Sequence, residues 1–181
     1  MKTPISFLYQ IEKPGIASGT LSLHQQSVSF QVTNVSNPLY DLLKGMASLI
    51  FEPSHLWGEE NMSWIDWYAE SNGIKWVLST EDGKQVHLKV IEYLDIFDES
   101  TGKVKIDGVC DFLDLYGAIV QRLDTFIKEM GLLNYEQQWQ KDEFPITYFL
   151  LLKKHLIEKG SWVSEKIKNN TLNDEIDLLL A

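Results

Sequence analysis

The sequence predicts an α+β fold: an antiparallel β-sheet packed by one early helix and two or three C-terminal helices. Alternating apolar residues mark strands near the N-terminus and again between residues 63 and 97. Apolar residues at helical spacing lie between these two regions and dominate from residue 111 onward. The 181 residues fit a single domain, 1–181, which buries roughly 70% of its unfolded surface. The tail from about residue 169 is either docked or mobile.

The N-terminal region is expected to form a hairpin. Residues 5–11 alternate apolar and polar side chains and stop before the turn signal Pro14-Gly15. Between Gly19 and Val35 the alternation recurs twice around the polar run 24–27, which predicts a turn. The polar positions of these strands predict a face that is exposed to solvent.

A helix is predicted to follow the hairpin. Asn37-Pro38 supplies an N-cap and a proline at the first helical position. Pro53 ends the helix by residue 52. Gly45 lowers helix propensity and indicates close packing of the helix on the sheet. The residues of its apolar stripe are Leu39, Leu42, Leu43, Met46, Leu49 and Ile50.

The stretch from Ser63 to Phe97 predicts a three-strand antiparallel meander. Asn72-Gly73 and Asp82-Gly83 divide it into three β-rich runs, and both dipeptides tolerate the positive φ of tight turns. Alternate residues of the first strand are apolar, so that face is expected to pack against the helices. The opposite face of this strand mixes aromatic side chains with carboxylates.

Helices are predicted for most of the remaining chain. After a short strand at 104–106, a long helix is expected from about 111 to 130, followed by Gly131 in the C′ position. Another helix, 146–159, is apolar nearly all round at 148–152, which predicts burial between two elements. The apolar end of the chain is either a docked short helix or a mobile end.

The acidic composition bears on which partners the protein can bind. The net charge is −10, and residues 51–100 hold eleven acidic residues against three lysines. This charge repels a phosphate backbone, so nucleic-acid binding is not expected. It either attracts a basic protein partner or serves solubility alone.

The location expected from the sequence is cytoplasmic. No apolar run reaches the roughly 20 residues of a bilayer span, so no membrane association is expected. The N-terminus lacks the apolar core of a signal peptide. The single cysteine, Cys110, does not allow an internal disulfide.

The mixed face of the first meander strand is the candidate site for a partner. Aromatic side chains offer rigid, amphipathic contact area, and neighbouring carboxylates add charge. The residues assigned to this contact face are Trp64, Asp66, Tyr68 and Glu70, with Glu59 and Glu60 on its rim. The structural alternative is that Trp64 and Tyr68 are covered by the C-terminal segment or by the loop around Trp57.

No catalytic, metal or nucleotide-binding motif is present, so no cofactor is expected. His55 and Glu59 would point together as metal ligands only on a helix, and Pro53 and Gly58 predict a loop there. Cys110 precedes a helix start, where a thiol pKa falls, but no pattern supplies an activating histidine. A buried, inert thiol is therefore expected.

His87 has a simple explanation as well. It lies on the same side of its strand as Lys89 and is expected to form a cross-strand ion pair with Asp66 or Glu70. Such a pair requires no catalytic role.

The segment Asn-Pro-Leu-Tyr-Asp-Leu-Leu-Lys-Gly-Met at 37–46, followed by strands Trp-Val-Leu at 76–78 and Val-His-Leu-Lys-Val at 86–90, carries a resemblance. The layout resembles small, acidic, uncharacterised bacterial proteins, some of them suspected immunity proteins of polymorphic toxin systems. The resemblance covers about half of the chain and leaves out the helices from residue 111 onward. It implies a cytoplasmic inhibitor that binds a toxin domain and has no catalysis of its own.

Three functional hypotheses follow. The first is a non-catalytic protein-binding module of the immunity type, which binds a basic partner such as a toxin domain. The second is a small-molecule binder or enzyme whose pocket, lined by Trp67, Trp76 and Tyr116, lies between the sheet and the long helix. The third is a subunit completed by self-association, since the sequence leaves the oligomeric state open.

Overall fold

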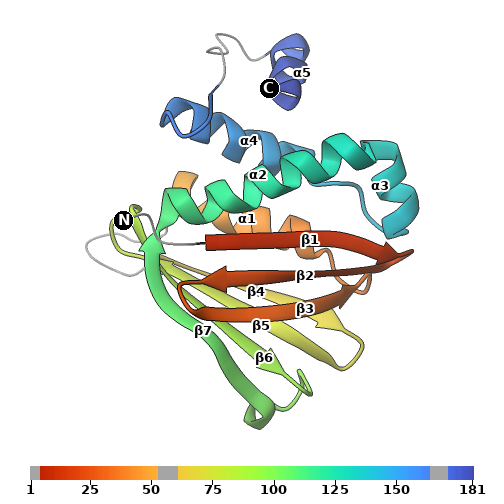
Figure 1. Ribbon diagram of the computed structural model, residues 1–181, viewed down its shortest axis with the longest axis vertical. Coiled ribbons are helices and arrows are strands. Elements are labelled where there is room, and N and C mark those ends of the chain that lie inside the picture. Colours follow the sequence, from red (N-terminus) through yellow and green to blue (C-terminus); the bar gives the residue numbers. More distant parts are fainter. Residues whose placement is uncertain (1–4, 53–60, 164–170) are drawn as a thin grey trace.

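The computed structural model describes residues 5–52, 61–163 and 171–181 of the chain, and it confirms the α+β class. These ranges contain seven strands, five α-helices and one 3₁₀ turn (Figure 1). In chain order the elements are β1 Ile5–Lys13, β2 Ile16–Leu23, β3 Gln26–Thr33, α1 Pro38–Phe51, β4 Asn61–Ala69, β5 Asn72–Thr80, β6 Gln85–Tyr93, η1 Glu99–Thr101, β7 Gly102–Asp111, α2 Phe112–Met130, α3 Leu132–Trp139, α4 Ile146–Glu158 and α5 Leu172–Leu180.

The strands form two antiparallel sheets, where the sequence predicted one. Their orders are β1-β2-β3 and β4-β5-β6-β7. The N-terminal region thus forms a three-stranded sheet rather than a hairpin. β2 pairs with both β1 and β3, and a two-residue turn, His24-Gln25, joins β2 to β3. The meander gains a fourth strand, since β7 pairs with β6 from Gly102 to Asp111. The sequence showed only a short strand there because two glycines and several charged residues leave few apolar positions along β7.

The core lies between the two sheets and is rich in aromatic rings. Phe30 and Trp67, from opposite sheets, have ring centroids 5.0 Å apart, and Phe7 lies 6.4 Å from Trp76. Trp67 and Trp76 themselves are 5.0 Å apart. These edge-on and tilted ring pairs stabilise the core by more than the burial of their apolar area alone.

The helices cover the sheet edges in successive layers. α1 packs along β4 and α2 along β1, while α4 lies over both helices and α5 lies on α4 (Figure 1). α1 begins as predicted, with Asn37 Oδ1 accepting the Tyr40 N–H at 3.3 Å. α2 is capped in the same way by Asp111 and ends at Gly131, as predicted.

The C-terminal end of the chain is a docked helix. Thr171 and Asp174 form a reciprocal capping box at the start of α5. Leu178 is buried against α4, and the Leu179 carbonyl accepts a hydrogen bond from Lys153 Nζ at 3.3 Å. The structure thus favours the first of the two alternatives that the sequence left open.

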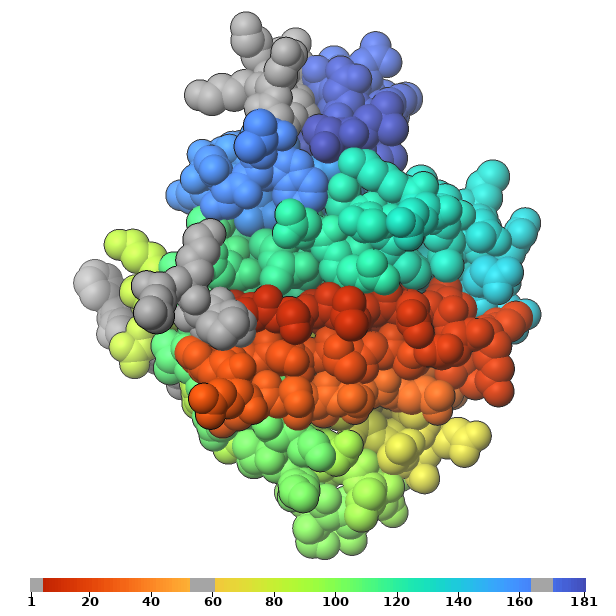
Figure 2. All heavy atoms as spheres, viewed as in Figure 1, coloured from red at the N-terminus to blue at the C-terminus, as the bar shows by residue number. Residues whose placement is uncertain are grey.

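The outer face of the three-stranded sheet is polar, as predicted, and lies at the front in Figure 2. The turn between β2 and β3 also protects the edge of β7. Gln26 Oε1 accepts the Asp107 N–H at 2.7 Å, and His24 Nε2 lies 3.3 Å from the Val109 carbonyl. The side chains of Gln26 and His24 therefore contact backbone groups of β7 that would otherwise be available to pair with a strand of another chain.

One of the two predicted meander turns is wrong. The loop between β4 and β5 is Glu70-Ser71, with Glu70 at φ 56°, and Asn72-Gly73 begins β5. Gly73 is required for a different reason, because a Cβ there would lie 2.2 Å from the Trp67 carbonyl oxygen. The turn at Asp82-Gly83 is confirmed, with Gly83 at φ +68°.

Alanine substitutions at two helical glycines are expected to change the free energy of unfolding in opposite directions. A Cβ at Gly45 of α1 would lie 2.6 Å from Ser63 Oγ and 2.9 Å from Ile65 Cδ1, so α1 would be pushed from β4. A Cβ at Gly117 of α2 would lie 3.5 Å from Leu156 Cδ2, an ordinary contact. Gly45→Ala should lower the free energy of unfolding by about 1–3 kcal/mol. Gly117→Ala should raise it by roughly 0.5–1 kcal/mol.

Urea denaturation of both variants provides the measurement, with equal m-values as the check that midpoints report stability. Stabilisation by Gly45→Ala would contradict the close approach of α1 to β4.

Candidate functional site

β4 alternates as predicted. Ile65, Trp67 and Ala69 are buried, whereas Trp64 on the opposite face is 68% exposed. Asp66 and Tyr68 share that outer face and are half-buried. None of the described residues covers Trp64 to the extent that the structural alternative requires, although the loop around Trp57 lies outside the described residues.

Glu70, the fourth residue assigned to the contact face, follows the last residue of β4. Glu70 is exposed in the loop at the end of β4, where its backbone is left-handed. It therefore lies at the border of the outer face. Glu59 and Glu60, predicted for the rim, lie outside the described residues.

A groove of about 410 Å³ runs between α1 and β4 and includes three of the predicted residues. We call it the α1–β4 groove. Its lining residues are Asp41, Lys44, Gly45, Ser48, Ser63, Trp64, Ile65, Asp66 and Tyr68. The sequence did not reveal Asp41 and Lys44 as site residues, because only the packing of α1 along the β4 edge brings them there.

The α1–β4 groove holds negative charge that is only partly compensated. Burial raises the pKa of the Asp41 carboxyl, and the charges of Asp142 and Asp66 add to this rise against the opposing effect of Lys44. Among the described residues, the cation that pairs with Asp66 is Lys75, whose Nζ is 3.9 Å from Oδ1, and that oxygen is shielded from solvent without a hydrogen-bond partner there. Burial, and then the charge of Asp66, raises the pKa of Tyr68. These charges suit a cationic group in the groove.

His87 has a different partner from the one that the sequence suggested. Its Nε2 lies 2.6 Å from Asp107 Oδ1 on β7, because the register places His87 beside Ser79 and Val109. The prediction of a pair with Asp66 or Glu70 is therefore wrong. Both partners are about half exposed, so the pair contributes little to stability.

The described residues offer no nucleophile at Cys110 and no metal cluster. Cys110 is 2% exposed, and burial, followed by the charges of Asp111 and Asp114, raises its pKa to about 11. The thiol is therefore protonated at neutral pH, as expected for an inert residue. No group of three or more histidine, cysteine or acidic side chains gathers in the described ranges. His55, with Glu59 and Glu60, lies outside them.

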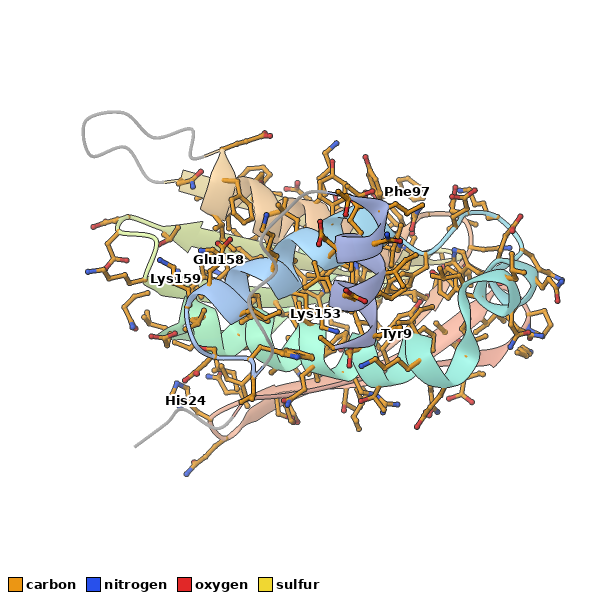
Figure 3. The ribbon with its side chains drawn as sticks, turned by 90° about the horizontal axis from the view of Figure 1, so that it is seen from above. Tyr9, His24, Phe97, Lys153, Glu158 and Lys159 are labelled. Carbon is orange, nitrogen blue, oxygen red and sulfur yellow. The ribbon has the colours of Figure 1, made fainter. Side chains whose placement is uncertain are left out.

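Tyr116 and His155 are two further titratable groups in direct contact. The Tyr116 hydroxyl lies 2.7 Å from His155 Nδ1 and joins α2 to α4. Burial, and then the charge of Lys159, lowers the pKa of His155, while Glu158 opposes the shift (Figure 3 labels both flanking residues). Burial raises the pKa of Tyr116. Both groups are therefore neutral near pH 7, which suits a structural hydrogen bond.

The lowered pKa of His155 predicts a pH dependence of stability. The unfolded chain binds a proton near pH 6.5, whereas the folded chain does so only at lower pH. The free energy of unfolding should therefore fall as the pH decreases below about 6.5 and level off below the folded pKa. Urea titrations between pH 5 and 8 should show a smaller slope for His155→Gln than for the wild type. An unchanged slope would show that His155 is solvated like a free histidine.

The cavity proposed for a small-molecule binder is not formed by the residues assigned to it. Trp67 and Trp76 are fully buried and pack against each other. Tyr116 instead lies against Phe112 and His155, with ring centroids 5.3 Å and 5.9 Å away. These side chains fill the core where the hypothesis placed a ligand.

Comparison with known proteins gives no relative: no protein-family model matches the chain, and neither does any curated protein or solved structure. Among the described helices, none has both the length and the apolar character needed to cross a lipid bilayer. The candidate function therefore depends on the geometry of the chain itself.

Proposed function

We propose that this protein is a non-catalytic binding module that holds a basic protein partner on the outer face of β4. The observation that carries the proposal is Trp64, 68% exposed at the mouth of a groove that also contains Asp41 and Asp66. An exposed tryptophan on a regular strand presents large contact area at little entropic cost, and tryptophan is enriched at binding hot spots.

The charge of the α1–β4 groove supports a cationic partner. Asp41 and Asp66 line one groove in which Lys44 is the cation among the lining residues, within a chain of net charge −10. Lys75 Nζ lies 3.9 Å from Asp66 Oδ1, beyond hydrogen-bond distance. A lysine or arginine of the partner would form a closer, hydrogen-bonded ion pair with Asp66. The same charges would accelerate encounter with a basic surface.

The proposal extends to the immunity type through the resemblance of the 37–46 helix and the following strands to suspected immunity proteins. In that form, the partner is a basic bacterial toxin domain, and binding occludes the toxin. No chemistry by this chain is required.

Groove variants test this proposal. Tagged protein is used to isolate partners from its native lysate, or from a lysate that supplies a candidate toxin domain, and a stoichiometric partner is then titrated. Trp64→Ala should weaken its binding by about 2 kcal/mol, or roughly 30-fold in Kd. The double variant Asp41→Lys, Asp66→Lys should slow association by about tenfold and flatten its salt dependence.

The matched control is Glu129→Lys, which changes an exposed carboxylate of α2 to the same charge away from the groove. It should leave association nearly unchanged. A genuine partner that binds the groove variants as tightly as the wild type would remove the α1–β4 groove from the proposed function.

A small-molecule function has a different place in this fold from the one that the sequence suggested. An apolar groove of about 410 Å³ lies between α4 and α5, with Leu150, Leu151 and Ile176 among its lining residues. An apolar ligand there would raise the melting temperature by mass action. Leu150→Gln should abolish that rise, whereas Trp64→Ala should not.

A further inference from the structure

The loop between β6 and β7 exposes two large apolar side chains at one extremity of the molecule. Figure 1 shows this loop, residues 94–101, as the lowest part of the fold. Leu94 is 76% exposed and Phe97 is 88% exposed. Exposure of this degree leaves almost the whole apolar surface of both residues in water, which favours their burial by a partner.

Hydrogen bonds fix the conformation of this loop. The Phe97 N–H donates to Asp95 Oδ1 at 3.0 Å, and the Ser100 N–H donates to Asp98 Oδ1 at 3.0 Å. The Thr101 hydroxyl accepts from the Asp95 N–H at 3.1 Å and donates to the Asp95 carbonyl at 2.9 Å. The loop is therefore ordered before any contact is made, which lowers the entropic cost of binding.

The loop is also anchored to the neighbouring hairpin. The Ile96 N–H donates to the Ser71 carbonyl at 2.8 Å. The Ile96 side chain is half-buried and reaches the space above Gly73, where an added Cβ would lie 3.0 Å from Ile96 Cδ1. Ile96 thus points inward, while Leu94 and Phe97 on either side of it remain exposed.

Negative charge surrounds the two exposed side chains. Asp95, Asp98 and Glu99 are exposed on the loop itself, and Glu70 is exposed in the hairpin loop to which Ile96 is bonded. Hydrogen bonds from Ser100 lower the pKa of Asp98 and keep it ionised at neutral pH. An anionic lipid surface would be repelled by these carboxylates, whereas a basic protein surface would be attracted.

We propose that loop 94–101 is a second docking site, which inserts Leu94 and Phe97 into an apolar pocket of a protein partner rimmed by lysine or arginine. Two apolar anchors inside a charged rim have the anatomy of a protein interface. This site is separate from the α1–β4 groove and does not depend on the function proposed for it.

Site-specific photo-crosslinking in the native cell tests the site. p-Benzoyl-phenylalanine replaces Leu94, Phe97 or, as a control, Leu133, which is 79% exposed on α3. Positions 94 and 97 should crosslink to one stretch of one protein, apolar in its centre and flanked by lysine or arginine, and position 133 should not. The variant Leu94→Ser, Phe97→Ser should then bind that protein at least about tenfold more weakly, with unchanged thermal unfolding.

Four results would overturn the inference: yields at 94 and 97 no higher than at 133, crosslinks to an acidic stretch, crosslinks to lipid, or crosslinks to a second copy of the chain. Benzophenone at Trp64 in the same experiment separates the two proposals. A partner captured at 64 but not at 97 would leave the α1–β4 groove in place and remove this second site.

Discussion

An Asp124→Ala variant is expected to lose about 3–5 kcal/mol of the free energy of unfolding at pH 7, because it leaves a fully buried lysine without a counter-charge. Lys153 is 0% exposed, and its Nζ lies 2.8 Å from Asp124 Oδ1. Figure 3 shows Lys153 within the helical layer beneath α5.

Among the described residues around Lys153, none replaces the carboxylate of Asp124. Its ammonium also donates to the Leu179 carbonyl at 3.3 Å and lies 4.8 Å from the Trp162 ring. These dipolar and cation–π contacts are weaker than an ion pair in a desolvated site. Burial already lowers the pKa of Lys153 although Asp124 opposes this.

The reverse substitution should be milder. In Lys153→Met, Asp124 keeps its second partner, because Asp124 Oδ2 lies 2.9 Å from Lys128 Nζ one helical turn away. The variant should therefore lose less stability than Asp124→Ala. The double variant Asp124→Leu, Lys153→Met should recover most of the loss, since a well-packed apolar pair often equals a buried ion pair. Urea denaturation of Asp124→Leu, Lys153→Met and their double variant gives the coupling energy.

The pH dependence identifies the buried charge as the cause. In Asp124→Ala, the pKa of Lys153 is lowered further below its unfolded value, so stability should rise with pH up to about 10. The difference in the free energy of unfolding between Asp124→Ala and the wild type should thus become smaller between pH 7 and pH 9.5. A difference that is small and independent of pH would mean that the Lys153 ammonium reaches solvent and that α5 does not bury it.

The sequence predicted the faces of β4 correctly even though it placed the adjoining turn wrongly. A two-residue turn at Asn72-Gly73 would pair Ser71 with Ile74, whereas the structure pairs Ala69 with Asn72. The two registers differ by an even number of residues, so the same side chains stay inside. Face assignment needs only the alternation of apolar residues, but the turn depends on the close approach that Gly73 allows.

Non-local features account for what the sequence did not reveal. The burial of Lys153 could not be predicted from the sequence, because a pair of lysines carries no sign that Asp124 and α5 enclose one of them. The division into two sheets is of the same kind, since alternating strands specify faces but not which strands pair. The helices were easier, because caps such as Asn37 and Asp111 act within one turn.

The candidate site was predictable only in its strand half. Trp64, Asp66 and Tyr68 follow from alternation along β4. Asp41 joins them because α1 packs along the edge of that strand, a contact that local sequence does not specify. The exposed pair in loop 94–101 was missed for the opposite reason: apolar residues in the sequence are taken to be buried unless the fold shows otherwise.

Trp67→Ala is expected to lower the free energy of unfolding by about 3–5 kcal/mol, the cost of truncating a large aromatic residue in a packed core. Trp67 is fully buried, and its ring centroid lies 5.0 Å from both Phe30 and Trp76. It touches the opposite sheet and its own, so the cavity left behind cannot close by moving one strand. Trp67→Phe should cost less, since it fills part of the space and removes an indole N–H without a hydrogen-bond partner.

The matched control lies three residues earlier on the same strand. Trp64→Ala removes the same side chain from an exposed position and should change stability by no more than about 0.5 kcal/mol. Thermal or urea unfolding of both variants measures the contrast. Equal losses would mean that Trp64 has a structural role in the folded protein, and the binding face would lose its central residue. A large loss at Trp67 alone would mean that the exposed Trp64 contributes nothing measurable to folding, which would leave it available for the binding role proposed for the α1–β4 groove.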